Sequence, residues 1–142
     1  MGGGETDEEF LAAFEADAIP KADFHHREHV RLAWVFLRRH GPAEATRRMR
    51  EGIRRFAASH GVPGLYHETL TTFWVLAVEA ALRVDPAAAD FESFARRHPE
   101  LLDKHFVRRH YREGTIECER ARTEWIAPDR APLPGPGLAP KA

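Results

Sequence analysis

The sequence predicts an all-α fold: a single compact bundle of five to seven helices, followed by an extended proline-rich C-terminal tail. Three observations lead to this prediction. Apolar residues recur at the i, i+3, i+4, i+7 spacing of a helix face along most of the chain, and convincing strand alternation is absent. Capping residues, glycines and prolines interrupt the pattern at intervals typical of short helices. The length of 142 residues suits one domain.

The first half of the chain contains the clearest helical patterns. Thr6 and Glu9 have the spacing of a capping box and open a short helix. Gly41 and Pro42 are typical of a helix end followed directly by a helix start. The next expected helices span 24–40, 42–59 and 65–84. The last of these is apolar around more than half of its circumference, so we expect it at the centre of the bundle.

The second half is expected to contain shorter helices at 91–98, 99–114 and 115–126, the last with Thr115 as its N-cap. From Ala127 onward the chain is rich in proline and has no periodicity, which predicts an extended tail. We therefore divide the chain into a flexible N-terminus (1–5), a helical bundle domain (6–126) and an extended tail (127–142).

Composition and charge exclude several classes of protein. The 21 basic and 22 acidic residues give a net charge of −1, which argues against a dedicated nucleic-acid binder. Arg47, Arg50 and Arg54 share one side of a predicted helix and offer a local phosphate-binding face, but a solvated face is favoured. The sequence lacks a signal-peptide pattern and a long apolar run, so no membrane partner is expected. Because Cys118 is the single cysteine, a disulfide framework is excluded and a cytoplasmic location is expected.

The unusual feature of the composition is its nine histidines. Three of them, His40, His60 and His98, fall at the ends of predicted helices, where the helix dipole gives a sufficient structural reason. His105 lies one position off an apolar stripe and is a weak candidate for a site.

Four other histidines fall on predicted core faces. His26 and His29 are i, i+3 neighbours on one helix face. His67 begins a column that continues through Leu70, Thr71 and Trp74, and His110 extends an apolar column of its own. His25 is i, i+4 from His29, so whether it replaces His26 stays open. These positions predict that the histidines meet at one end of the bundle.

Three neutral imidazoles with one open position are typical of a catalytic zinc site. The expected metal ligands are His26, His29, His67 and His110, and the cofactor is a divalent transition metal: zinc, iron, copper or nickel. Glu68 is a candidate general base or fourth ligand, and Tyr111, like Tyr66, a hydrogen-bond donor to a bound oxyanion. The alternatives are a metal-free polar pocket and a purely structural histidine network. No HExxH motif is present.

Three motifs resemble those of a family of small uncharacterised bacterial all-helical proteins: FxHxxHV (24–30), YHETxTxxW (66–74) and the C-terminal PDxxPLP (128–134). The resemblance covers residues 24–134 and brings no reaction with it. It implies that His26, His29 and His67 are the site residues. It also implies an ion pair between Arg122 and Asp129 that ties down the tail.

The leading hypothesis is a small cytoplasmic metal-binding protein, an enzyme that acts on a small molecule through a histidine-rich site at one end of the bundle. The alternative from another class is a non-catalytic helical interaction module with a structural histidine network. A third, weaker hypothesis is a nucleic-acid accessory protein. The sequence leaves the oligomeric state open, a homodimer included.

Overall fold

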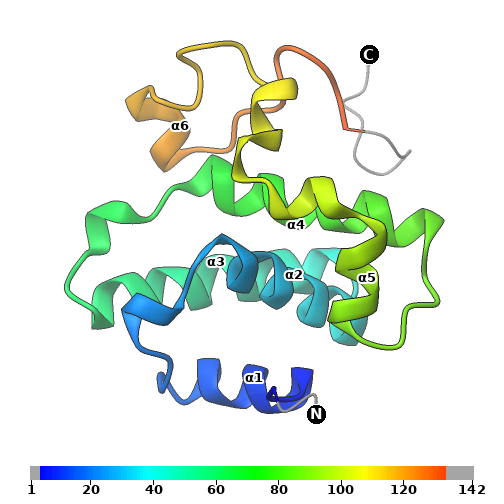
Figure 1. Cartoon of the computed structure of the whole chain (residues 1–142). Coiled ribbons are helices and arrows are strands. Elements are labelled where there is room, and N and C mark those ends of the chain that lie inside the picture. The colour runs from blue at the N-terminus through cyan, green and yellow to red at the C-terminus, as the bar shows by residue number, and fades with distance from the viewer. Residues whose placement is uncertain (1–3, 134–142) are drawn as a thin grey trace.

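The computed structural model describes residues 4–133, and within them the chain is all-α, as predicted (Figure 1). This part of the chain contains no strand. Positions 134–142 of the predicted tail, and 1–3 of the predicted N-terminus, lie outside the described residues. Six α-helices and four 3₁₀ helices follow in order: α1 Asp7–Glu15, η1 Lys21–Asp23, α2 His26–His40, α3 Pro42–Ser59, η2 Pro63–Leu65, α4 Glu68–Val84, α5 Phe91–Arg97, η3 Pro99–Leu102, η4 Lys104–Arg109 and α6 Glu119–Thr123.

Helices α2, α3 and α4 pack against one another and form the centre of the molecule. Helix α1 lies against α2 on one side of this centre, and α6 lies against α4 on the opposite side (Figure 1). Helix α5 and η3 contact α2 near one end of the bundle. The result is a layered bundle in which the last third of the chain covers α4.

The predicted start and stop signals act as expected in the first half of the chain. The Thr6 hydroxyl accepts a hydrogen bond from the Glu9 backbone N–H at 3.0 Å, and the Thr6 N–H donates to the Glu9 carboxylate at 2.9 Å, so the capping box is confirmed. Gly41 has a φ of +82° between α2 and α3, and Pro42 is the first residue of α3. This backbone conformation favours glycine and lets the two helices follow without a linker.

The core contains the predicted apolar stripes and further apolar residues of α2. Val30, Ala33, Trp34 and Leu37 are all buried on α2, as expected. Residues of α2 outside this stripe are buried as well, so α2 shares the centre of the bundle with α4, which was expected to hold it alone: Leu32, Val35 and Phe36. A helix apolar on most sides is typical of an element covered on most sides.

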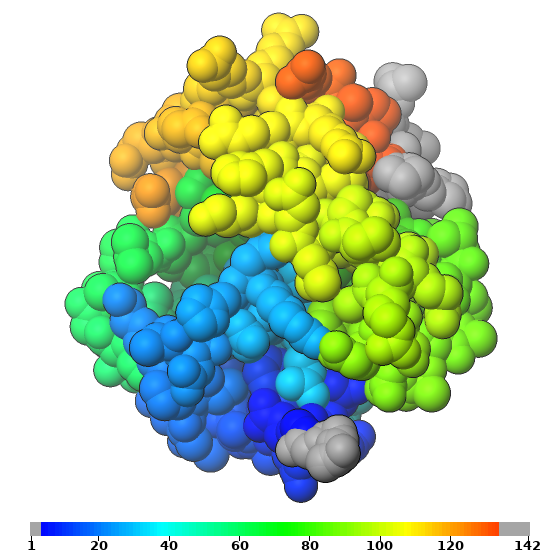
Figure 2. Space-filling view, viewed as in Figure 1, coloured from blue at the N-terminus to red at the C-terminus, as the bar shows by residue number. Residues whose placement is uncertain are grey.

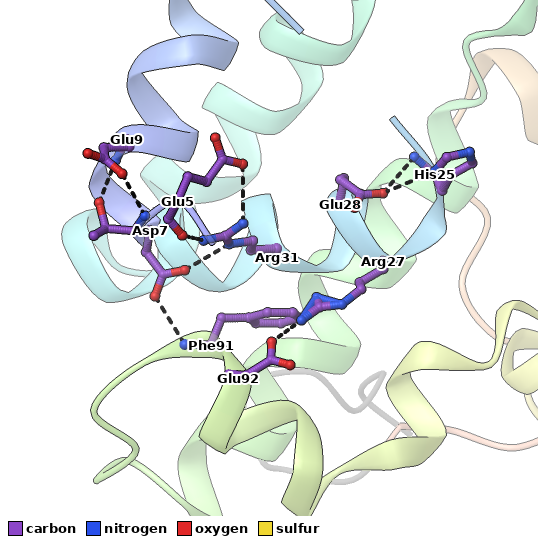
Figure 3. A network of polar contacts seen from close by, with 10 residues as sticks. Glu5, Asp7, Glu9, His25, Arg27, Glu28, Arg31, Phe91 and Glu92 are labelled. Carbon is purple, nitrogen blue, oxygen red and sulfur yellow. Dashed lines mark hydrogen bonds and ion pairs between the residues drawn. The ribbon is translucent and has the colours of Figure 1, made fainter. Parts of the chain in front are cut away.

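A polar network fixes α1 and α5 to α2 (Figure 3). Asp7 carries two of its links: its Oδ1 accepts from Arg31 Nε at 2.8 Å, and its Oδ2 accepts from the Phe91 N–H at 3.0 Å. Arg27 of α2 pairs with Glu92 of α5. The network therefore joins three helices that are far apart in the sequence.

At Gly52 the backbone of α3 lies close to Phe14 of α1. A Cβ placed on this buried glycine would lie 2.7 Å from Cε2 of Phe14, a distance that requires movement. Phe14 is itself buried, so the absence of a side chain at residue 52 lets the Phe14 ring lie against the α3 backbone.

The C-terminal predictions need correction. The helix expected at 99–114 is two separate 3₁₀ helices, η3 and η4, and the helix expected at 115–126 is the five-residue α6. Thr115 does not cap a helix, because its hydroxyl donates to Asp129 Oδ2 at 2.6 Å. Long-range contacts of this kind override local helical preference. We call residues 103–133 the C-terminal cap.

Side-chain-to-backbone hydrogen bonds attach the C-terminal cap to the bundle. Thr69 of α4 donates to the Glu124 carbonyl at 2.7 Å, and Arg122 donates to the Gly64 carbonyl at 3.0 Å. The implied ion pair between Arg122 and Asp129 is therefore wrong: Asp129 instead accepts from Thr115 and from the Arg112 N–H.

No helix among residues 4–133 has both the length and the apolar character needed to cross a membrane.

Candidate functional site

A cavity of about 840 Å³ lies where the C-terminal cap meets the bundle. Its walls come from the first residues of α2 and α4, the second half of α3 and the cap. In Figure 2 the surface is hollowed where the cap (yellow) meets the earlier segments (blue and green). The volume falls within the range of roughly 300–1,000 Å³ that is typical of small-molecule sites.

The cavity walls are mainly apolar and aromatic. Phe24 and Phe56 lie together with their ring centroids 4.8 Å apart. The column predicted from the sequence, His67, Leu70, Thr71 and Trp74, lines the cavity along α4. Such walls favour a ligand with an apolar or aromatic body, held in place by a few polar groups.

His29 is the polar group of the cavity wall that lacks a partner. Its Nε2 is buried and has no hydrogen-bond partner among residues 4–133. Burial, and secondarily the neighbouring His26, lowers the pKa of His29 to about 4, so the ring is neutral at physiological pH. A neutral imidazole offers one N–H donor and one lone pair, and which nitrogen carries the proton depends on the tautomer.

His26 lies beside His29 on the first turn of α2. Its Nε2–H donates to the Leu101 carbonyl at 2.9 Å, and its ring packs edge-on against Trp74 with centroids 4.4 Å apart. Burial lowers the pKa of His26 as well. The neutral ring donates through Nε2, so its Nδ1 lone pair remains for another partner. His25, in contrast, is the exposed N-cap of α2, so the structure places His26 and not His25 in the cavity wall.

His67 lines the cavity, but both of its ring nitrogens are used by the fold. Its Nδ1 accepts from the Leu70 N–H at 3.1 Å as the N-cap of α4, and its Nε2–H donates to the Ile116 carbonyl at 2.8 Å. His67 therefore links the start of α4 to the C-terminal cap and has no lone pair left for a metal.

His110 lies outside the cavity wall. Its Nδ1–H donates to the Ala131 carbonyl at 2.8 Å, and its own carbonyl accepts from the Arg130 N–H at 2.9 Å. These bonds hold the described part of the tail against the cap. The fourth expected metal ligand thus has a structural role.

In the part of the chain that the structure describes, no group of three or more His, Cys, Asp or Glu side chains is arranged to hold a metal ion. The four histidines occupy core faces as predicted, but only three of them line one cavity: His26, His29 and His67. A metal site formed by all four would require His67 to give up one of its two hydrogen bonds and His110 to move into the cavity wall, and it stays a prediction.

Glu68 is held away from the cavity by a cluster between α3 and α4. Its carboxylate accepts from the Tyr66 hydroxyl at 2.6 Å and pairs with Arg50 at 2.7 Å and Arg54 at 3.6 Å. Its side chain is 8% exposed. Burial and the Glu68 hydrogen bond raise the pKa of Tyr66 to about 12. Because its carboxylate is held by Tyr66 and two arginines and does not line the cavity, this geometry favours a structural role for Glu68.

Tyr111 lines the cavity, but its hydroxyl already donates to the Ile126 carbonyl at 2.6 Å. Burial raises the pKa of Tyr111 above its ordinary value. Because its proton is used in this bond, the Tyr111 hydroxyl can only accept a hydrogen bond from a ligand.

The remaining histidines are explained by their positions. His40 ends α2, and His60 and His98 are the C-caps of α3 and α5, which confirms the predicted helix-end roles. The His98 Nε2–H also donates to Asp85 Oδ2 at 2.9 Å. His105 is exposed, yet it lines the cavity mouth, which its sequence position did not indicate.

Apart from Tyr111, sequence analysis missed the part of the site that comes from the C-terminal cap. The basic residues Lys104 and Arg108 line the cavity because the cap folds back over α4, and no local pattern shows this. The predicted columns on α2 and α4 were the usable signal. They identified the walls formed by α2 and α4, whereas the wall formed by the cap depends on long-range contacts.

Comparison with known proteins adds no relative: no family model, no curated protein and no solved structure matches the chain. The fold class and the cavity therefore define the chain only as a small all-helical protein with a candidate small-molecule site.

Proposed function

We propose that this protein binds a small organic molecule in the cavity between α2, α3, α4 and the C-terminal cap. The observation that carries the proposal is the large cavity with apolar and aromatic walls, which His26, His29 and His67 also line.

The low pKa of His29 favours binding over base catalysis. A group with a pKa of about 4 is neutral at physiological pH, but it has little affinity for a proton taken from a substrate. As a neutral ring beside Phe24, with ring centroids 6.2 Å apart, it is suited to orient a ligand by one hydrogen bond. We therefore place His29 as the orienting group and the apolar walls as the main source of affinity.

The proposal can be tested with N-phenyl-1-naphthylamine, an uncharged aromatic probe whose fluorescence rises in apolar sites. We expect saturable, near-stoichiometric binding to the intact chain. Ile53→Trp fills the cavity from α3 and should abolish this binding, since Ile53 lines the wall. Arg55→Trp, an exposed site on the same helix, is the matched control and should bind as the unmodified chain does.

Circular dichroism and urea unfolding show whether each variant is folded. Binding that survives in a folded Ile53→Trp variant places the probe elsewhere and contradicts the proposal. Absence of saturable binding to the intact chain contradicts it as well.

A second candidate function keeps the metal of the original hypothesis. His26 and His29 are adjacent neutral imidazoles, the form that zinc, iron, copper and nickel bind. Two protein ligands would leave positions for a substrate, which describes a metal-dependent enzyme. Isothermal titration with zinc chloride and nickel chloride, on protein made without a histidine tag, tests it. A heat of metal binding that disappears in His29→Phe but remains in His110→Phe supports the metal-binding hypothesis. An equal heat of binding in both variants contradicts it.

The nucleic-acid hypothesis receives less support. Arg47 pairs with Glu44 and Glu51, and Arg50 and Arg54 pair with Glu68, so the basic face of α3 is largely neutralised. Since Cys118 is exposed and free, a reducing compartment such as the cytoplasm suits the chain.

A further inference from the structure

Basic side chains gather around the cavity that the proposed function uses. Lys104, Arg108, Arg112 and Arg130 come from the C-terminal cap, and Lys21 comes from η1 on the bundle side. The lining contains only two carboxylates, Glu113 and Glu117. Burial lowers the pKa of His26 and His29, and the five cations outnumber the two carboxylates, so the cavity lining has an excess of positive charge.

These cations differ from the other basic residues of the chain in their pairing. Within residues 4–133, none of the five lies within ion-pair distance of a carboxylate. The bundle arginines mostly have such partners: Arg31 pairs with Asp7 at 2.8 Å, for example. The cavity lining therefore brings together five cations that have no carboxylate within ion-pair distance in residues 4–133.

The cap arranges two of these cations as neighbours. The Arg130 guanidinium donates to the Arg108 carbonyl at 3.1 Å, which fixes Arg130 against η4. Lys104, at the start of η4, is near enough to His26 for its charge to act on that ring, although burial, the Leu101 hydrogen bond and the opposite charge of Asp103 act on the pKa of His26 more strongly. Lys104 thus lies close to the same face of the cavity as His26.

We infer that the ligand is an amphipathic anion: an apolar or aromatic body that fills the cavity next to His29, and one carboxylate or phosphate group at the mouth beside Lys104 and Arg108. This inference rests on the proposed function and names its ligand class. Guanidinium groups suit planar carboxylates and phosphates, and uncompensated charge at a concave mouth raises the rate at which anions arrive.

The test compares two fluorescent probes with nearly the same aromatic body, 8-anilinonaphthalene-1-sulfonate, which is anionic, and N-phenyl-1-naphthylamine, which is not. Both are titrated against the intact chain and against the double variant Lys104→Gln/Arg108→Gln. We expect the dissociation constant of the anionic probe to rise about tenfold in the double variant, as for loss of a charge-assisted contact. The constant for the uncharged probe should change less than about twofold.

Arg55→Gln is the matched control, because Arg55 is an exposed arginine outside the cavity. Its two constants should equal those of the intact chain. Equal affinity of the intact chain for both probes, with no effect of the double variant, overturns the inference and leaves the cavity as a binding site. Failure of both probes to bind overturns the proposed function itself.

A competition series then separates the two anion sources. Decanoate and decyl phosphate are each used to displace the anionic probe, with decanol as the uncharged competitor. Displacement by either anion at concentrations at least about tenfold lower than decanol supports the inference, and the better of the two identifies the head group. Displacement by decanol at equal concentration overturns it.

Discussion

The helical bundle and the C-terminal cap satisfy their buried polar groups in different ways. The bundle uses helix hydrogen bonds, capping residues such as Thr6 and carboxylate–arginine pairs such as Asp7–Arg31. The cap has little regular helix and depends on single side chains that bond to distant carbonyls, among them His67 to Ile116 and Tyr111 to Ile126.

This difference shows which part of the molecule is expected to open first. A segment with few helical hydrogen bonds and a small number of tethers opens with a lower free energy than a packed helix pair. The cavity lies between the two regions. Local opening of the cap should therefore make the cavity more accessible, whereas the bundle helices form its remaining walls. Mutations that act on one region and not on the other can test this division.

The largest effect is expected at Phe73, which joins the two regions. Its ring is fully buried on α4 and lies 5.7 Å from the Tyr111 ring and 5.5 Å from the His110 ring. Phe73→Ala should lower the free energy of unfolding by about 3–5 kcal/mol, through lost burial and a residual void. Urea unfolding measures this, and Leu65→Ala, at a residue that is 65% exposed, should change it little. A small loss in Phe73→Ala contradicts the shared core.

The pH dependence of stability tests His29. The ring has a pKa of about 4 in the folded chain against an ordinary value of 6.5. Because the unfolded chain takes up the proton more readily, the stability due to the neutral ring is present above pH 6.5 and is lost as pH falls toward 4. Between pH 7 and pH 5 this amounts to roughly 2 kcal/mol.

His29→Phe removes this group and keeps an aromatic ring in the wall. Between pH 7 and pH 5 the variant should therefore lose roughly 2 kcal/mol less unfolding free energy than the unmodified chain. His40→Phe, at the exposed end of α2, is the matched control and should keep the original pH dependence. Identical slopes in His29→Phe and in the unmodified chain contradict the assignment of a buried neutral ring.

A smaller effect is expected at His67, which serves both regions. His67→Ala removes the N-cap of α4 and the bond to Ile116 and should cost about 1–2 kcal/mol of unfolding free energy. His67→Asn keeps a capping oxygen but loses the link to the cap, so it should recover about half of that loss. If both variants lose the same free energy of unfolding, the N-cap role of His67 does not contribute to stability.

The smallest effect on global stability is expected at Asp129, which acts within the cap alone. Asp129→Ala removes the acceptor for Thr115 and for the Arg112 N–H, and should change the free energy of unfolding by less than about 1 kcal/mol. Amide hydrogen exchange of residues 110–131 should nevertheless become faster, because the cap opens locally.

Asp90 is the matching residue in the bundle, where it caps α5 through the Ser93 N–H. Asp90→Ala should lower global stability by about 1 kcal/mol and leave exchange in the cap unchanged. If the two variants behave alike, the distinction between bundle and cap does not hold.

The sequence by itself determined the all-α class, the capping box at Thr6, the Gly41–Pro42 junction and the buried faces of α2 and α4. These features depend on periodicity and on backbone rules that act within a few residues. The columns that contain His29 and Trp74 were also visible in the sequence, and both line the cavity.

Only the tertiary structure decided how the polar residues are used. The His67 Nε2–H bonds to the carbonyl of Ile116, which is 49 residues away, and this bond leaves His67 no nitrogen for a metal. The Glu68 carboxylate forms ion pairs with two arginines of another helix. Thr115 has the local pattern of a helix cap but bonds to Asp129. The chain fixes which faces are apolar, but a polar group takes the partner that the packed chain brings to it, and those partners are set by contacts across the whole fold.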